Sequence, residues 1–175
     1  MLHYVRRATQ QDVIEIMQLI DDAKELLKSN GNPQWQNGYP NKDTIKQDIA
    51  NDNGYVLIVN QQVVGYAALI VGLEPNYTEI QGSWRNNDDS YATIHRIAIK
   101  SNMHGKNLAN LFIGNLITLT LAQNVNNIRI DTHRVNKAMQ HLVGKYAFEY
   151  RGIINVADEV DSERLAYELN LKNNI

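Results

Sequence analysis

The chain has 175 residues, with 17 basic and 19 acidic side chains and a formal net charge of −2, so no strong field favours nucleic acid or an anionic membrane. It is long enough for one domain with a sizeable core and short for two. It contains no cysteine, which excludes disulfides, thiolate metal sites and a cysteine nucleophile. No apolar run approaches about 18 residues, and no charged and then apolar leader opens the chain. The five histidines are scattered, without HExxH or a similar pairing, so we expect no metal. We also expect a cytoplasmic protein with no membrane or nucleic-acid partner.

The first part of the chain alternates between strand and helix signals. Residues 2–8 alternate partially, as a strand does, and Thr9 and Asp12 have the spacing of a capping box. Apolar residues at helical spacing then continue until the sequence SNGNP. The next segments are predicted to be a loop over 34–40, a helix over 41–50 capped by Asn41, a hairpin of 55–59 and 63–71, and an irregular stretch over 73–90.

The second part has longer regular segments. The sequence predicts a strand over 91–100, a helix over 105–123, a strand over 127–133, a helix over 136–147, and strands over 148–154 and 163–171. Hairpins thus alternate with strand–helix–strand units. This order predicts an α/β protein, with residues 1–175 as a single domain around one mixed sheet.

One turn in this pattern has the composition of a phosphate site. The sequence IKSNMHGKNLANLF, residues 99–112, leads from a strand into a helix through His-Gly-Lys-Asn-Leu-Ala. Many such turns only connect two elements. The same composition also lets a phosphate approach the backbone N–H groups at a helix N-terminus. Neither a P-loop nor a dinucleotide-binding GxGxxG sequence accompanies it.

This turn resembles the acyl-CoA loop of the GNAT-type N-acetyltransferases, [Q/R]-x-x-G-x-[G/A]. His104 stands at the Gln or Arg position, Asn107 at the middle glycine and Ala109 at the last position. Asn is the non-glycine residue that best tolerates a left-handed backbone, so Asn107 can replace a glycine there. Neutral His104 keeps a hydrogen-bond donor but supplies less charge than Arg.

A second segment supports the same resemblance. NKAMQHLVGKYAF, residues 136–148, is similar to the family pattern N-x-x-A-x-x-L-Y-x-K-x-G-F. Four positions match, Asn136, Leu142, Lys145 and Phe148. Met139, Val143 and Ala147 replace the family's Ala, Tyr and Gly. Together with the order of elements, the resemblance implies a single-domain GNAT fold, with a mixed and largely antiparallel twisted sheet flanked by about four helices.

The resemblance implies acetyl-CoA as co-substrate and assigns residues to it. The backbone amides expected to hold the pyrophosphate are those of His104, Gly105, Lys106, Asn107, Leu108 and Ala109. The strand residues expected to pair with the pantetheine arm are Ile97, Ala98 and Ile99, and Asn136 completes the cofactor-binding set. The side chain of Lys106 either meets a phosphate or is solvated.

The resemblance also implies direct transfer of the acetyl group to an amine. A histidine at the place of His95 relays the proton in arylalkylamine-type members, and an imidazole titrates near neutrality. The alternative for His95 is a half-buried structural histidine. The family's tyrosine that protonates the leaving thiolate is here Val143. Tyr146, one turn further along, is the candidate acid, with a core or rim aromatic as the alternative.

The acceptor is expected to be a primary amine of a small molecule or a peptide. Trp35, Tyr39, Tyr77 and Trp84 are candidate acceptor-binding residues, with Glu74, Glu79 and Asp88 nearby, because aromatic rings beside carboxylates suit a cationic amine. Anchoring of loops onto the sheet is the alternative role, for Trp84 in particular. The rival function is an acyl-CoA-binding module of the same fold with little or no turnover, and the sequence leaves a homodimer open.

Overall fold

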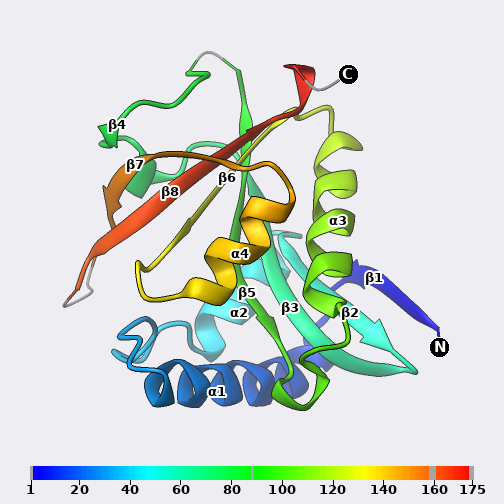
Figure 1. The fold of residues 1–175 in the computed structure, drawn as a ribbon. Helices are drawn as coiled ribbons and strands as arrows, with labels where there is room; N and C mark the ends of the chain where they lie inside the picture. Colours follow the sequence, from blue (N-terminus) through cyan, green and yellow to red (C-terminus); the bar gives the residue numbers. More distant parts are fainter. Residues whose placement is uncertain (1, 88, 158–160, 174–175) are drawn as a thin grey trace. The chain divides into compact units, whose positions relative to one another are not determined.

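A computed structural model describes residues 2–87, 89–157 and 161–173, which form eight strands and four α-helices (Figure 1). In chain order they are β1 (His3–Arg7), α1 (Val13–Ser29), α2 (Lys42–Ala50), β2 (Gly54–Val59), β3 (Gln62–Val71), β4 (Gln81–Gly82), β5 (Tyr91–Ile99), α3 (Leu108–Leu121), β6 (Asn127–Thr132), α4 (Lys137–Lys145), β7 (Glu149–Asn155) and β8 (Glu163–Asn170). Short 3-10 turns lie between some of them.

The strands form one sheet in the order β1-β2-β3-β5-β6-β8-β7-β4. Strands β5 and β6 pair in parallel, whereas the pairs β1–β2, β2–β3, β6–β8, β7–β8 and β4–β7 are antiparallel. The predicted α/β class, with a mixed and largely antiparallel sheet and about four helices, is therefore confirmed. Figure 1 shows β8 running between β6 and β7.

The chain divides into two compact units, residues 1–69 with 95–115, and residues 70–94 with 116–175. The core of the first unit packs α1 and α2 onto the N-terminal strands. Its fully buried residues include Ile16 and Ile20 of α1, Ile45 of α2 and Tyr66 of β3. The predicted Asn41 cap explains where α2 begins, whereas the predicted Thr9–Asp12 capping box opens the 3-10 turn Gln10–Asp12 directly before α1. The side chain of Asn41 accepts the N–H groups of the first turn of α2, and the carboxylate of Asp12 accepts the Thr9 N–H at 2.7 Å.

The core of the second unit is aromatic. Tyr77, Trp84 and Tyr91 pack with Ile154 and Ala166 of the C-terminal hairpin. Tyr77 and Trp84 come from the stretch predicted to be irregular, whose described residues form a 3-10 turn at Pro75–Tyr77 and the two residues of β4. In this stretch, which has little regular structure, the buried aromatic rings therefore hold the chain against the C-terminal hairpin.

Two helix boundaries differ from the prediction for a local physical reason. Helix α3 begins at Leu108, three residues later than predicted, because Gly105 and Asn107 have φ of +78° and +61° and cannot belong to a right-handed helix. Helix α4 ends at Lys145, two residues early, because Ala147 has φ of +57°. Within the described residues, no helix is long and apolar enough to cross a membrane.

Candidate functional site

The turn before α3 has the backbone conformation of an anion-binding loop. After β5, a 3-10 turn at Ser101–Met103 leads to His104, and the left-handed residues Gly105 and Asn107 follow directly. The first N–H groups of α3 have no carbonyl partner within the helix. Alternating backbone handedness together with a helix N-terminus concentrates N–H groups on one side of a turn. The loop therefore fits an anion such as a pyrophosphate.

The side chains of this loop hold its shape. The Nε2–H of His104 donates to the Ile99 carbonyl at 3.0 Å, which ties the loop to the end of β5. The side-chain amide of Asn110 donates to that of Asn107, and the Lys106 ammonium lies 3.4 Å from the Met103 sulfur on the exposed surface. Asn107 occupies the left-handed conformation predicted for it. The side chain of His104 is directed to the strand end in this arrangement.

Strand β5 contains one left-handed residue, Arg96, and this irregularity is called the kink of β5 below. Arg96 has φ of +56°, a conformation that costs a non-glycine residue roughly 1–2 kcal/mol. The parallel pairs with β6 use Tyr91 to Thr93 on the β5 side, and β5 continues to Ile99. The kink lies between His95 and Ile97, both half-buried. It therefore separates the candidate general base from the candidate pantetheine-pairing residues.

A buried ion pair holds the side chain of Arg96. Its Nε and Nη2 donate to the two carboxylate oxygens of Asp48 of α2, at 2.9 and 2.6 Å, and the two side chains are 8% and 7% exposed. The Tyr66 hydroxyl donates to the same carboxylate at 2.7 Å. Burial, together with the negative charge of Asp48, raises the pKa of Tyr66, which keeps the phenol protonated.

The loop between α1 and α2 carries Trp35 and Tyr39, two of the candidate acceptor-binding residues. Trp35 is half-buried and packs against the core of the first unit. Tyr39 is 37% exposed, and its hydroxyl accepts a hydrogen bond from Nη1 of Arg96 at 2.5 Å. The Lys24 ammonium donates to the Pro40 carbonyl at 2.7 Å, which fixes the loop to α1. Of these two rings, Tyr39 presents the more accessible surface.

The other two candidate acceptor-binding residues are buried in the second unit. Tyr77 and Trp84 are 2% and 7% exposed, with ring centroids 5.2 Å apart, and the Trp84 indole N–H donates to the Tyr77 carbonyl at 3.0 Å. The guanidinium of Arg129 lies between Trp84 and Tyr91, 4.1 and 3.9 Å from the ring centroids. These contacts favour loop anchoring for both residues. Asp88, expected nearby, lies outside the described residues.

Sequence reasoning missed the carboxylate of Asp131, a half-buried residue of β6. The Tyr77 hydroxyl donates to its Oδ2 at 2.8 Å. Burial raises the pKa of Tyr77 well above its usual value, and the charge of Asp131 raises it further. Strand alternation places Asp131 on the opposite face from buried Ile130 and Thr132, so the pattern alone predicts a solvent-facing carboxylate and not a partner of Tyr77.

Helix α4 contains the residues that resemble the family's second segment. The Asn136 side chain caps the helix by accepting the Met139 N–H at 3.1 Å. Val143 is fully buried, and Tyr146, the residue at the C-terminal cap, is half-buried. The Phe148 and Ala147 N–H groups donate to the carbonyls of Val143 and Gly144, each at 3.3 Å. This is the Schellman pattern, with a left-handed Ala147 where glycine is usual.

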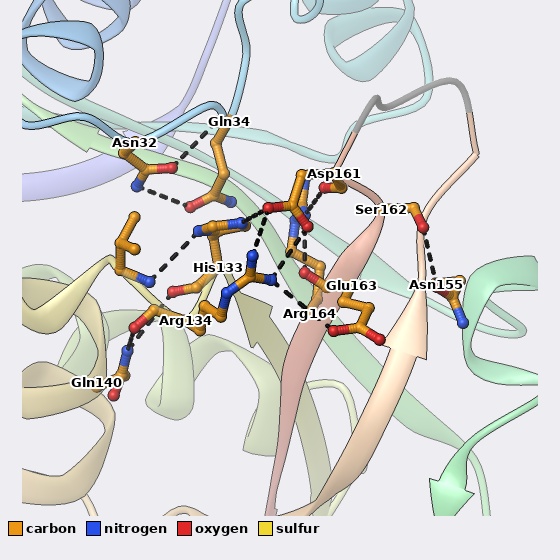
Figure 2. A network of polar contacts seen from close by, with 11 residues as sticks. Asn32, Gln34, His133, Arg134, Gln140, Asn155, Asp161, Ser162, Glu163 and Arg164 are labelled. Atoms are coloured by element: carbon orange, nitrogen blue, oxygen red, sulfur yellow. Dashed lines mark hydrogen bonds and ion pairs between the residues drawn. The ribbon is translucent and has the colours of Figure 1, made fainter.

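A second buried histidine, His133, lies at the end of β6 and was not singled out from the sequence. Figure 2 shows His133 and Arg134 directed toward Asp161. Nε2 of His133 lies 3.0 Å from a carboxylate oxygen of Asp161, and the Val135 N–H donates to Nδ1 at 3.3 Å. Arg134 donates to both oxygens of Asp161 at 3.1 and 2.8 Å. Hydrogen bonds from His133, and then from Arg134, lower the pKa of Asp161.

This arrangement selects one tautomer of a neutral His133. Because Val135 N–H can only donate, Nδ1 is the acceptor, and Nε2 carries the hydrogen that points to Asp161. Both ring nitrogens are therefore engaged within the protein. His133 has the carboxylate partner of a catalytic histidine but presents no free lone pair to a substrate, so it is not a second candidate base.

Comparisons with known proteins agree with the architecture. The family model described as the Acetyltransferase (GNAT) family matches residues 16–148. A GNAT-family acetyltransferase from Streptococcus agalactiae is 34% identical, with 96% of this chain and 95% of that chain covered and a TM-score of 0.88. An acetyltransferase from Staphylococcus aureus described as putative is 27% identical, with 95% and 98% covered and a TM-score of 0.72. The PaiA N-acetyltransferase from Thermoplasma acidophilum, solved with coenzyme A, is 12% identical, with 97% and 99% covered and a TM-score of 0.73. A search of curated proteins found no match.

Proposed function

Because the chain belongs to the GNAT acetyltransferase family, we propose that it transfers the acetyl group of acetyl-CoA directly to a primary amine of a small molecule or a peptide. The observation that carries the proposal is the loop before α3, where left-handed Gly105 and Asn107 precede a helix N-terminus. Such a loop suits a pyrophosphate. A Cβ built on Gly105 has no atom within 4 Å, so this side of the loop is open.

The residues of the loop and of β5 hold the cofactor in this proposal. The amides from His104 to Ala109 bind the pyrophosphate, and the positive end of the α3 dipole adds to their attraction. Backbone groups of Ile97, Ala98 and Ile99 pair with the pantetheine arm, as an added strand does. Asn136 is retained as a cofactor-binding residue through its backbone, because its side-chain oxygen caps α4.

The reaction needs a base that deprotonates the amine and an acid that protonates the leaving thiolate. Acetyl-CoA supplies an activated thioester carbonyl, so that a C–N bond to the amine forms while the C–S bond breaks and the sulfur takes the bonding electron pair. His95 removes the proton of the attacking ammonium, directly or through water. Tyr146 gives its phenolic proton to the departing thiolate, and the second proton that the nitrogen loses as the amide forms returns to the Tyr146 phenolate through water. A cationic amine is bound beside Trp35 and Tyr39 through aromatic contacts.

The experiment measures free-thiol release from acetyl-CoA with a panel of primary amines, which comprises a polyamine, an arylalkylamine and a short peptide. We expect turnover with at least one amine, and His95→Ala lowers it roughly 10²- to 10⁴-fold, the usual contribution of a positioned base. CoA affinity stays within a few-fold, and the acidic limb of the pH–rate profile flattens. His141→Ala, which removes an exposed histidine of α4, is the matched control.

Two results would contradict this proposal in different ways. A preserved acidic limb in folded, CoA-competent His95→Ala protein would remove His95 from the role of base. Tight CoA binding without thiol release for every amine would favour the rival function, a GNAT-fold module that binds acyl-CoA without turnover. The buried Val143, where the family has tyrosine, is the observation that favours this rival.

A further inference from the structure

The residue at the kink of β5, Arg96, has a side chain that donates hydrogen bonds to two other side chains. Arg96 is the residue with left-handed backbone conformation, and its guanidinium donates to Asp48 through Nε and Nη2 and to Tyr39 through Nη1. A non-glycine residue keeps such a conformation only where its surroundings over-determine it. Here the surroundings that hold the guanidinium are helix α2, through Asp48, and the loop between α1 and α2, through Tyr39.

The ion pair fixes the guanidinium in one orientation. Its two parallel hydrogen bonds to the Asp48 carboxylate, at 2.9 and 2.6 Å, match the planar fork of an arginine, which a lysine ammonium does not reproduce. Asp48 is held in turn by the Tyr66 hydroxyl at 2.7 Å. Since both charged side chains are less than a tenth exposed, water cannot replace either partner without a large penalty.

The remaining donor connects the kink to the loop between α1 and α2. Nη1 of Arg96 donates to the hydroxyl of Tyr39 at 2.5 Å. Burial opposes the charge on Arg96, but Tyr39 and Asp48 more than compensate, so the pKa of Arg96 is raised and the guanidinium stays charged. One charged group therefore ties the backbone between His95 and Ile97 to a loop proposed to line the acceptor site.

We propose that Asp48, Arg96 and Tyr39 form a positioning unit for acetyl transfer. In this unit the ion pair stabilises the left-handed backbone of Arg96, and the hydrogen bond to Tyr39 fixes the position of the loop between α1 and α2 relative to β5. The inference rests on the proposed function and names how its site is kept in place. None of the three residues needs to touch the reacting atoms. The unit sets the direction of the peptide groups on either side of Arg96, and with them the position of the His95 side chain.

Two substitutions at Arg96 separate positioning from packing. Glycine adopts the left-handed conformation readily, whereas alanine favours the extended conformation of a strand. We expect Arg96→Ala to lose about 10- to 100-fold in kcat at saturating substrates, as a misplacement of about 1 Å can cause. Arg96→Gly retains more turnover than Arg96→Ala. If Arg96 only fills the core, Ala performs as well as Gly or better, because glycine weakens a strand, and that order would overturn the proposal.

Tyr39→Phe tests the contact between Arg96 and the loop, because it removes the hydroxyl that Arg96 binds and keeps the partly exposed ring. We expect KM for the amine to rise several-fold with CoA affinity unchanged. Asp52→Asn is the control, because its carboxylate pairs with Arg7 on the surface at 3.1 Å and Asn suits its left-handed backbone. An unchanged KM in Tyr39→Phe would remove Tyr39 from the unit.

Hydrogen exchange gives a readout that does not depend on turnover. Relative to wild type and Asp52→Asn, Arg96→Lys is expected to speed amide exchange within residues 95–99 and 35–41, while β2 exchanges as before. Faster exchange throughout the first unit, or no change at all, would overturn the positioning unit. Wild-type protein that shows the local exchange effect but acetylates no amine would contradict the proposed function and leave the structural coupling intact.

Discussion

Replacing Gly105 by Asp tests the phosphate site most directly, because Asn at the same position is a nearly isosteric control. Gly105 has φ of +78°, and a Cβ there meets no atom within 4 Å, so the Cβ of either residue is accommodated and the backbone strain is common to both variants. Asp and Asn both visit the left-handed region more readily than other non-glycine residues. The two variants therefore differ mainly by one negative charge placed beside the proposed pyrophosphate.

The size of the effect follows from electrostatics. Two unit charges about 4 Å apart interact by roughly 1 kcal/mol in bulk water and about 4 kcal/mol near a protein surface. A repulsion of about 1.4 kcal/mol, near the lower limit, corresponds to a tenfold change in Kd. We therefore expect the Asp variant at Gly105 to bind CoA at least tenfold more weakly than the Asn variant.

Isothermal titration calorimetry with CoA and with pantetheine decides the question. Pantetheine lacks the pyrophosphate and should bind the wild type and both Gly105 variants alike. The difference between the two variants should shrink near 1 M salt, where the screening length falls to about 3 Å. Equal CoA affinities for the Asp and Asn variants in dilute buffer would refute the placement of the pyrophosphate on this loop.

Three further predictions concern stability. Ala147→Gly should raise the free energy of unfolding by about 0.5–1 kcal/mol, because Ala147 has φ of +57°; a lower urea midpoint would contradict this. Gly65→Ala should cost about 1–3 kcal/mol, because the new methyl would lie 3.1 Å from Cβ of Leu57 and 3.3 Å from the Ala98 carbonyl oxygen, besides 2.8 Å from the movable Cδ1 of Ile99; an unchanged midpoint would show that these neighbours yield freely. A hydrogen bond from Arg6 lowers the pKa of Asp12 from 3.8 to about 2. The Asp12 carboxylate therefore contributes stability above pH 3.8 that is lost as the pH falls through about 2. Since Arg6 is 38% exposed, we expect roughly 1–2 kcal/mol, and urea unfolding of Asp12→Asn should show a shallower loss of stability from about pH 5 to pH 2.

The order of elements was predictable because local signals agreed with the tertiary structure. Asn41 begins α2 as a cap, and the alternating runs on either side of the turn after Val59 form the predicted hairpin. The beginning of α3 was placed too early because apolar spacing does not report backbone handedness. The structure places Gly105 and Asn107 outside the helix, and a glycine and an asparagine in sequence are compatible with either assignment.

The acceptor side was less predictable for a different reason. Tyr77 and Trp84 lie in a stretch without periodicity, so the sequence could not say whether their rings faced solvent or the core. The structure buries both, with Arg129 against the Trp84 ring. The contacts of Arg96 with Asp48 and Tyr39 join residues 48 and 57 positions apart. Contacts at such separations cannot be assigned from one sequence, so the partners of Arg96 were not predictable.

The departures from the family pattern bear unequally on the two candidate functions. Asn107 and Ala147 replace glycines, yet both have the left-handed backbone that the glycines would supply, with φ of +61° and +57°. At Asn107 a hydrogen bond from the Asn110 side chain accompanies this conformation. At Ala147 the hydrogen bonds that end α4 impose it. Neither substitution therefore counts against a working CoA site.

Val143 differs in kind, because a buried valine supplies no hydroxyl in any conformation. The case for a module without turnover thus reduces to the protonation of the thiolate, a step that CoA can dispense with, since a thiol of pKa near 8.5 leaves readily as its thiolate.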